Sequence, residues 1–138
     1  METLFQIANM SVLPCWLLLV LAPRWRWTHV VCSIFMPLVL GSLYAWLFSA
    51  GMGEGGFGSL SEVMKLFMQP RAVLAGWVHY LAFDLFIGAW LTRDAMRHEL
   101  PRWALLPCQL LTFMLGPLGL LLYLLLRGTM RKQWEIGA

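Results

Sequence analysis

Long apolar runs alternate with short polar stretches along this chain of 138 residues. A helix of about 20 residues covers about 30 Å, which is the thickness of the hydrocarbon layer of a bilayer. The pattern therefore predicts an all-α protein, a four-transmembrane-helix bundle. We expect the spans at about residues 4–22, 30–49, 72–91 and 103–126, in a single integral membrane domain that covers residues 1–138.

Polar and glycine-rich residues separate these runs. The segment Pro23-Arg-Trp-Arg-Trp27 brings two arginines and two tryptophans to the level of the lipid headgroups, where such side chains settle. Glycines in residues 51–58 formally fit a dinucleotide-binding motif, but no strand precedes them, so the segment is interpreted as a linker. Ser59-Leu-Ser-Glu62 then has the spacing of a capping box. A short interfacial helix that ends at Pro70 is expected between spans two and three.

Composition agrees with a membrane protein. The chain is 60% hydrophobic and 12% charged, with a mean hydropathy of +0.71, which excludes an ordinary soluble domain. Its ten Lys and Arg residues are scattered among helix ends, so we interpret them as membrane anchors and expect no nucleic-acid partner. In the four-span arrangement they divide equally between the two sides, and the positive-inside rule selects no orientation. The three cysteines lie in apolar segments and are expected to be packing residues.

Span three contains two ionisable residues, His79 and Asp84. Such residues cost roughly 2.5–3.5 kcal/mol at the centre of a membrane helix, so they usually face a cavity, a partner or the bundle interior. Five residues apart on a helix, they point about 140° from each other and would need a pocket that wraps half of the helix. The pocket is predicted to include these residues: Trp77, Tyr80, Phe83, Gly88, Gln109, Thr112 and Gly116.

Other interpretations of these polar residues remain open. Asp84 can instead accept hydrogen bonds from Thr112, Gln109, a tyrosine or His79 and simply hold the bundle together. Arg93 and Asp94, just after span three, are expected at the interface, where local pairs with Arg97 and His98 would explain them. A metal site is an alternative for the loop residues His29, Asp94, His98 and Glu99, but their spacing fits no strong ligand motif, so no metal is predicted.

The densest motifs resemble a known family. They are His79-Tyr-Leu-Ala-Phe-Asp84-Leu-Phe-Ile-Gly88, then Asp94, Pro107-Cys108 and Gly116-Pro-Leu-Gly119, and the chain from about Trp77 to Arg127 is similar to the bacterial branch of the ABA-deficient-four family. Plant members of that family are linked to the formation of neoxanthin from violaxanthin. The resemblance implies a carotenoid isomerase that opens an epoxide to an allene, with His79 and Asp84 sharing the roles of acid and base.

The leading hypothesis is therefore an integral membrane protein, in a bacterial inner membrane, that binds a carotenoid or related isoprenoid and isomerises it. No cofactor is expected other than a bound carotenoid. The expected partners are membrane lipids, a lipophilic polyene and either a second copy of the chain or a larger membrane complex. The competing hypothesis is a non-catalytic subunit or pigment-binding assembly partner of such a complex, and a third class, ion transport, has only Asp84 in its favour.

Overall fold

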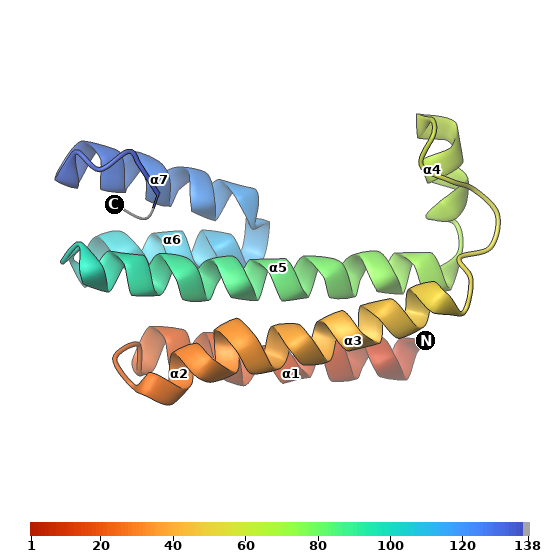
Figure 1. The fold of residues 1–138 in the computed structure, drawn as a ribbon, viewed down its shortest axis with the longest axis horizontal. Coiled ribbons are helices and arrows are strands. Elements are labelled where there is room, and N and C mark those ends of the chain that lie inside the picture. Colours follow the sequence, from red (N-terminus) through yellow and green to blue (C-terminus); the bar gives the residue numbers. More distant parts are fainter. Residues whose placement is uncertain (137–138) are drawn as a thin grey trace.

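The computed structural model describes residues 1–136, and their regular structure is entirely helical (Figure 1). Residues 26–49 form one continuous helical run made of α2, η1 and α3. The elements, in chain order, are α1 (Glu2–Leu21), α2 (Arg26–Val30), the π-helical turn η1 (Val31–Phe35), α3 (Met36–Ser49), α4 (Leu60–Leu66), α5 (Pro70–Arg97), α6 (Arg102–Leu115) and α7 (Pro117–Arg131). The all-α class predicted from the sequence is confirmed.

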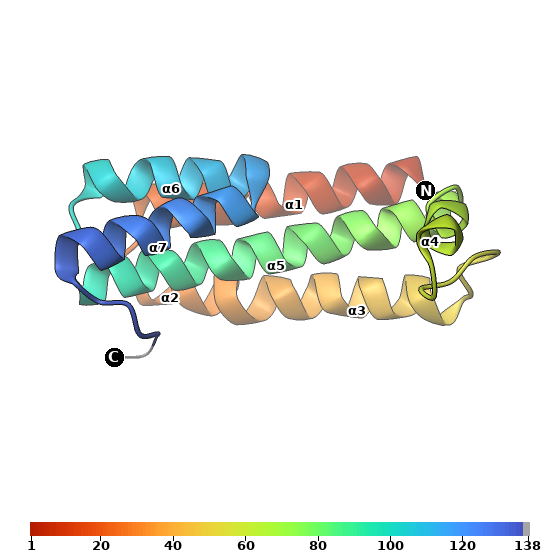
Figure 2. The ribbon, with the colours of Figure 1, turned by 90° about the horizontal axis from the view of Figure 1, so that it is seen from above.

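Three of these helical runs are long and apolar enough to cross a membrane: Glu2–Leu21, Arg26–Ser49 and Pro70–Arg97. They lie side by side along the long axis of the molecule (Figure 2). Between them is a core to which each run contributes fully buried residues, such as Leu19, Leu47 and Leu85. These features indicate an integral membrane protein. The cysteines Cys15, Cys32 and Cys108 are free and buried, as packing residues are.

A proline explains the irregular turn in the second run. Pro37 has no backbone N–H, so it cannot make the hydrogen bond that an α-helix requires at that position. The preceding residues, Val31–Phe35, take the wider π-helical form, a local adjustment that can satisfy the backbone groups freed by a proline. The run continues to Ser49 without a break in helical structure.

The C-terminal part of the chain differs from the prediction. Residues 103–126, expected as one continuous span, form two antiparallel helices, α6 and α7, that turn at Gly116 (Figures 1 and 2). Gly116 has φ +29° and ψ −87°, a conformation that a residue with a side chain rarely adopts, and Pro117 starts the new helix. The prediction of a continuous fourth span is wrong, because this Gly-Pro step reverses the chain instead of bending it.

The α6–α7 hairpin covers only half of α5. At its tip, the Tyr80 hydroxyl donates to the Met114 carbonyl oxygen at 3.1 Å. At its open end, the Arg131 guanidinium donates to the carbonyl oxygens of His98 and Glu99, at the end of α5. Because the hairpin returns to the side from which it started, the C-terminal end of α7 lies at the opposite end of the molecule from Met1 (Figure 1).

The short helix expected between spans two and three is α4. The Ser59 hydroxyl caps it by accepting from the Glu62 N–H at 3.2 Å, and the Glu62 carboxylate accepts from the Gly58 N–H at 3.1 Å. The α4 helix stands across the direction of the long helices at the end near Met1 (Figure 1). With the long helices crossing a membrane, α4 would lie along its surface, and Leu60 and Met64 are exposed on it, as is Met68 just after it.

Candidate functional site

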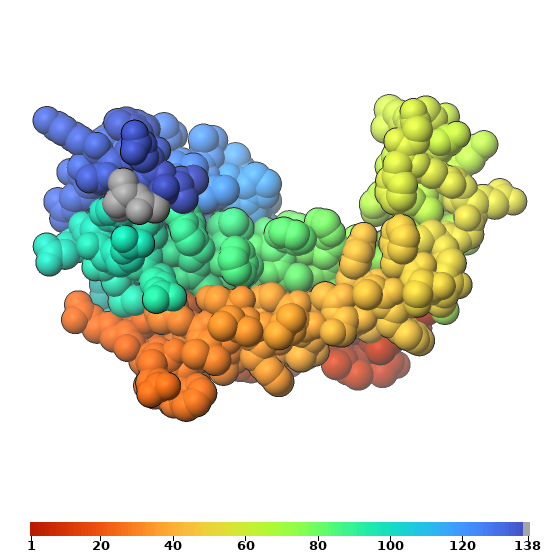
Figure 3. Space-filling view, in the orientation of Figure 1, coloured from red at the N-terminus to blue at the C-terminus, as the bar shows by residue number. Residues whose placement is uncertain are grey.

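The half-length hairpin leaves the other half of α5 open on one side. The space-filling view shows a hollow between the α6–α7 hairpin and α4, with α5 as its floor (Figure 3). The Phe67 ring after α4 lies against Gly76 at one end of this floor, at 3.0 Å from the place where a Gly76 Cβ would stand. We call this hollow the α5 groove; with the long helices in a bilayer, it would open sideways into the lipid.

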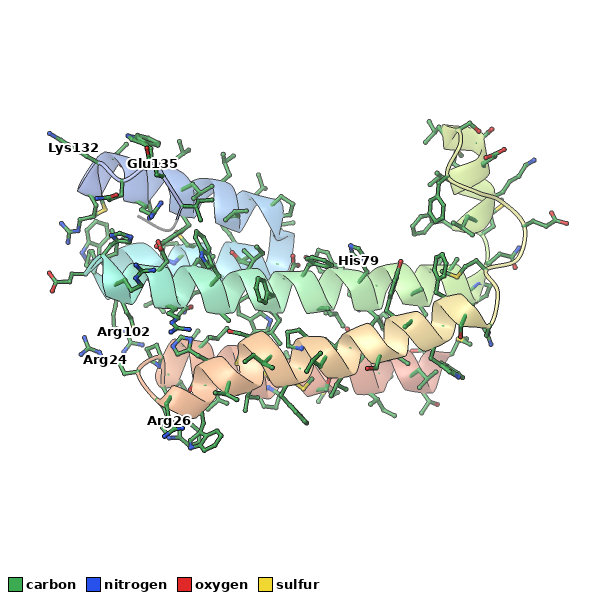
Figure 4. The ribbon with its side chains drawn as sticks, viewed as in Figure 1. Arg24, Arg26, His79, Arg102, Lys132 and Glu135 are labelled. Atoms are coloured by element: carbon green, nitrogen blue, oxygen red, sulfur yellow. The ribbon has the colours of Figure 1, made fainter. Side chains whose placement is uncertain are left out.

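Aromatic rings surround His79 on the floor of the α5 groove. The imidazole is exposed, and its centroid lies 4.7 Å from that of Phe83 and 5.5 Å from that of Tyr44 on α3. Phe83 itself is 59% exposed, so its ring is open to an incoming molecule. His79 is drawn on the edge of α5 that faces the hollow (Figure 4). An apolar molecule in the groove would therefore meet an imidazole set among rings.

A second aromatic pair lies on the side of α5 that faces α1. The Trp77 Nε1–H donates to the Asn9 side-chain oxygen at 2.7 Å, and the Trp77 ring contacts Phe5 at a centroid distance of 5.6 Å. Tyr80 stacks on Trp77 at 5.4 Å and bonds to Met114 through its hydroxyl. These bonds hold both rings in one orientation between α1 and the hairpin tip.

Asp84 meets the tip of the hairpin. A Cβ atom on Gly116 would stand only 2.5 Å from Asp84 Oδ1, so the carboxyl occupies the space that a side chain there would fill. The other oxygen, Oδ2, is buried and has no hydrogen-bond partner among residues 1–136. The N-terminus of α7 begins beside this carboxyl, and a helix N-terminus carries partial positive charge that favours an anion. The hairpin tip thus packs against the Asp84 carboxyl, and the Oδ2 atom of Asp84 is left as a free hydrogen-bond acceptor among the described residues.

Three of the residues predicted for the pocket lie elsewhere. Gly88 is packed under the Trp16 ring, where a Cβ would be 2.4 Å from the indole. Thr112 donates to the Cys108 carbonyl oxygen at 2.7 Å, and Gln109 donates to Thr92 Oγ1 at 2.8 Å and to the Leu19 carbonyl oxygen at 3.2 Å. Among the other predicted residues, the structure pairs Gly116 with Asp84, Trp77 with Tyr80, and His79 with Phe83. Gly88, Gln109 and Thr112 lie in the packing between helices instead.

A charged cluster was missed by sequence reasoning. Asp94 is 4% exposed, and its Oδ2 accepts from the Tyr123 hydroxyl and lies 2.8 Å from Arg127 Nε. Arg127 is completely buried, although the sequence predicted a surface anchor at that position. Of the two residues expected at the interface, Arg93 is exposed and Asp94 is buried. His98 completes the cluster, with Nε2 3.2 Å from an Arg127 guanidinium nitrogen.

The signal for this cluster was present in the sequence. Tyr123 and Arg127 are four apart, on one face of an otherwise apolar helix, and Asp94 supplies the opposite charge. The expectation of one straight span placed Asp94 and Arg127 on opposite membrane sides, and only the turn at Gly116 brings them together. Among residues 1–136, no group of three or more His, Cys, Asp or Glu side chains is arranged to hold a metal ion.

Comparison with known proteins gives one family. The family model described as ABA DEFICIENT 4-like matches residues 3–123. The protein ABA DEFICIENT 4, chloroplastic, of Arabidopsis thaliana is 24% identical over 110 residues, which cover 72% of this chain and 50% of the plant protein. This chain thus spans about half the length of the curated relative that it matches. No solved structure matches the chain.

Proposed function

We propose that this chain, which belongs to the ABA DEFICIENT 4-like family, binds a carotenoid or related isoprenoid in the α5 groove and isomerises it there. The observation that supports the proposal best is Asp84: a half-buried residue whose Oδ2 atom is buried without a hydrogen-bond partner among residues 1–136, at the inner end of a groove that opens toward lipid. The proposal places the protein in a bacterial inner membrane, as its resemblance to the bacterial branch implies. In this topology three helices cross the membrane and the α6–α7 hairpin enters and leaves it on one side.

The groove suits a long apolar molecule. Its floor carries the exposed Phe83 and the His79 imidazole, and the fixed pair Trp77 and Tyr80 borders it on the side of α1. Aromatic faces offer a polyene large contact areas without the loss of much side-chain freedom. The tip of the hairpin closes the inner end, so the ligand's end group would stop beside Asp84.

The proposed reaction is an isomerisation in which the substrate gains one proton and loses one. An acid protonates the oxygen of a 5,6-epoxide, the C–O bond breaks to give an alcohol, and a base removes a vinylic proton to leave an allene. One proton enters and one leaves, so no oxidant, reductant or water is consumed. Asp84 and His79 are assigned these two roles jointly.

A binding function without catalysis is the second candidate. It is favoured by the surroundings of His79, whose ring contacts Tyr44 and Phe83 and not Asp84. An imidazole held between rings can serve as part of an aromatic surface for a pigment. In that case the protein would act as a pigment-binding subunit of a larger membrane complex.

The test is purification of the protein after expression with a 5,6-epoxycarotenoid, followed by analysis of the extracted pigment. We expect bound pigment and an allenic product in the wild type, and a loss of product by at least about 100-fold in Asp84→Asn and His79→Ala, the usual contribution of an acid–base group. Matched controls are Glu54→Gln, an exposed acid in the linker, and Val73→Ala, an exposed residue of α5.

The outcomes separate the two candidates. Pigment that is bound but chemically unchanged in the wild type would support the binding subunit and reject the isomerase. Full product formation by both variants would reject the assignment of Asp84 and His79. A wild-type protein that retains no pigment would reject the α5 groove as a carotenoid site.

A further inference from the structure

A second hollow lies at the end of the molecule opposite α4. It has a volume of about 880 Å³ and is formed where α1 ends, α5 ends and α6 begins. Its walls include two arginines, one glutamate and the interfacial Trp25, together with apolar side chains such as Leu105. We call it the arginine pocket. None of its residues belongs to the α5 groove.

The two arginines give this pocket a net positive charge. Arg24 and Arg102 both line it, and both are drawn at the same end of the molecule (Figure 4). Arg102 uses one N–H group to bond the Val20 carbonyl oxygen at the end of α1 and keeps its other donors. Arg24 makes no ion pair or hydrogen bond within the part of the chain that the structure describes. Glu99 also lines the pocket, so two basic residues and one acidic residue contribute to its charge.

An apolar groove continues from the arginine pocket along the outside of the bundle. It has a volume of about 390 Å³, lies between α1 and α6, and is lined by residues such as Leu13, Leu17, Leu110 and Phe113. Leu21 and Gln109 line both hollows, so the two are contiguous. The Leu17 and Leu110 side chains are 59% and 63% exposed, which leaves room for a chain to lie across them.

A cationic pocket at headgroup level that leads into an apolar groove fits an amphiphile with a negative head. We infer that this site binds one anionic phospholipid, with its phosphate on Arg24 and Arg102 and an acyl chain along the α1–α6 groove. Arginine suits the head because its planar fork can bond two phosphate oxygens at once. Trp25 would lie at the headgroup boundary, where indoles settle. The site is independent of the carotenoid proposal.

The test is native mass spectrometry of the purified protein with added lipids. Phosphatidylglycerol should bind as a single copy and better than phosphatidylcholine of the same chain length. Since a basic residue near an anionic lipid contributes about 1 kcal/mol, Arg24→Gln should weaken phosphatidylglycerol binding about fivefold, and Arg102→Gln similarly. The matched control is Arg26→Gln, because Arg26 rests on the Trp27 ring at 5.0 Å and does not line the pocket.

A separate pair of variants tests whether an acyl chain lies in the α1–α6 groove. Leu110→Trp, which fills the apolar groove, should reduce retention of the lipid, whereas Leu125→Trp, an exposed position on α7, should not. If Arg102→Gln fails to fold, Arg24→Gln still tests the proposal, because Arg24 makes no hydrogen bond or ion pair within residues 1–136 that its loss would break. Equal losses in Arg24→Gln and Arg26→Gln, equal binding of phosphatidylcholine, or full displacement by inorganic phosphate would each overturn the proposal.

Discussion

Asp84 and Asp94 lie on the same helix, but the surroundings of their carboxyl groups differ. Asp94 has a complete set of partners: the Tyr123 hydroxyl, the Arg127 guanidinium and, at 3.5 Å, the His98 imidazole. Asp84 Oδ2 has none among the described residues. A carboxyl whose partners are all present suits a structural role, while an unused acceptor beside a groove suits a reacting one. We therefore expect the buried pair of Asp94 and Arg127 to stabilise the fold.

Replacement of Arg127 by Met should destabilise the protein strongly. It removes the positive charge from a buried pair and leaves the Asp94 carboxylate without its counter-ion, which typically costs about 3–5 kcal/mol. The double variant Asp94→Asn, Arg127→Met should recover part of this loss, because no unpaired charge remains. Reversible unfolding in mixed micelles measures both effects.

Arg93→Met is the matched control for that measurement. Arg93 is exposed next to Asp94, and surface substitutions usually change stability by less than about 0.5 kcal/mol. A loss in Arg127→Met no larger than the loss in Arg93→Met would contradict the structural role of the pair.

How far the sequence predicted these residues depends on which contacts are local. His79, Asp84 and their aromatic neighbours share one helix, so helical spacing was enough to select them. Gln109 and Thr112 are polar residues expected opposite Asp84, and Gly88 is a small residue four positions after Asp84 on the same helix. The contacts of Gln109 with Thr92 and of Gly88 with Trp16 follow from how α5, α6 and α1 pack, which spacing does not determine. Thr112 instead bonds the Cys108 carbonyl oxygen one turn back in its own helix.

At the scale of elements, the turn at Gly116 decides the shape of the site. Helical periodicity predicted the three long runs and the capping signal predicted α4, but an apolar run of 24 residues looks the same whether it crosses the membrane or turns back. The Gly-Pro-Leu-Gly119 step contained the information: Gly119 packs against Thr112, where any Cβ would meet the α6 backbone at 2.2 Å. Small residues at this spacing let α6 and α7 approach closely.

Gly116→Ala should weaken the hairpin and disturb Asp84. The new methyl group would be forced into a positive-φ conformation, at a cost of about 1–3 kcal/mol, and would also clash with the Asp84 carboxyl. The double variant Asp84→Ala, Gly116→Ala should show a favourable coupling of about 0.5–3 kcal/mol, because the clash is removed. The unfolding assay used for Arg127 measures this double-mutant cycle.

Gly51→Ala provides the control for backbone strain alone. Gly51 also has a positive φ, of 87°, but nothing lies within 4 Å of the place where its Cβ would stand. An effect of Gly116→Ala equal to that of Gly51→Ala, with no coupling to Asp84, would contradict the contact between the hairpin tip and α5.

At the scale of the whole molecule, the hairpin changes the distribution of charge. The four-span arrangement placed Arg127, Arg131 and Lys132 on the side of Lys65 and Arg71 and left five basic residues on each side. In the structure these three residues lie at the other end of the molecule, where Arg131 donates hydrogen bonds to the backbone just after α5. Eight of the ten Lys and Arg residues then lie at the end that holds the arginine pocket, and two at the end that holds α4.

This distribution predicts one orientation, since loops rich in Lys and Arg stay in the cytoplasm. We expect the α4 end, with Met1, on the outer side and the C-terminal end of α7 on the cytoplasmic side. Single cysteines at Glu54 and at Lys132 would report this in intact cells: a membrane-impermeant maleimide should label Glu54→Cys and leave Lys132→Cys unlabelled until the membrane is opened. The three native cysteines are buried, so their background labelling should be low.

The same experiment separates the two topologies. A straight fourth span would put residues 54 and 132 on one side, and both would then be labelled or protected together. Cysteines at Trp25 and Lys132 serve as a matched pair, because the hairpin places both at the basic end, whereas a fourth span would separate them.

The orientation also has a consequence for the lipid site: with its basic end in the cytoplasm, the arginine pocket faces the leaflet where anionic headgroups attract basic segments. Labelling of Lys132→Cys from outside would contradict the orientation and remove that support from the lipid proposal.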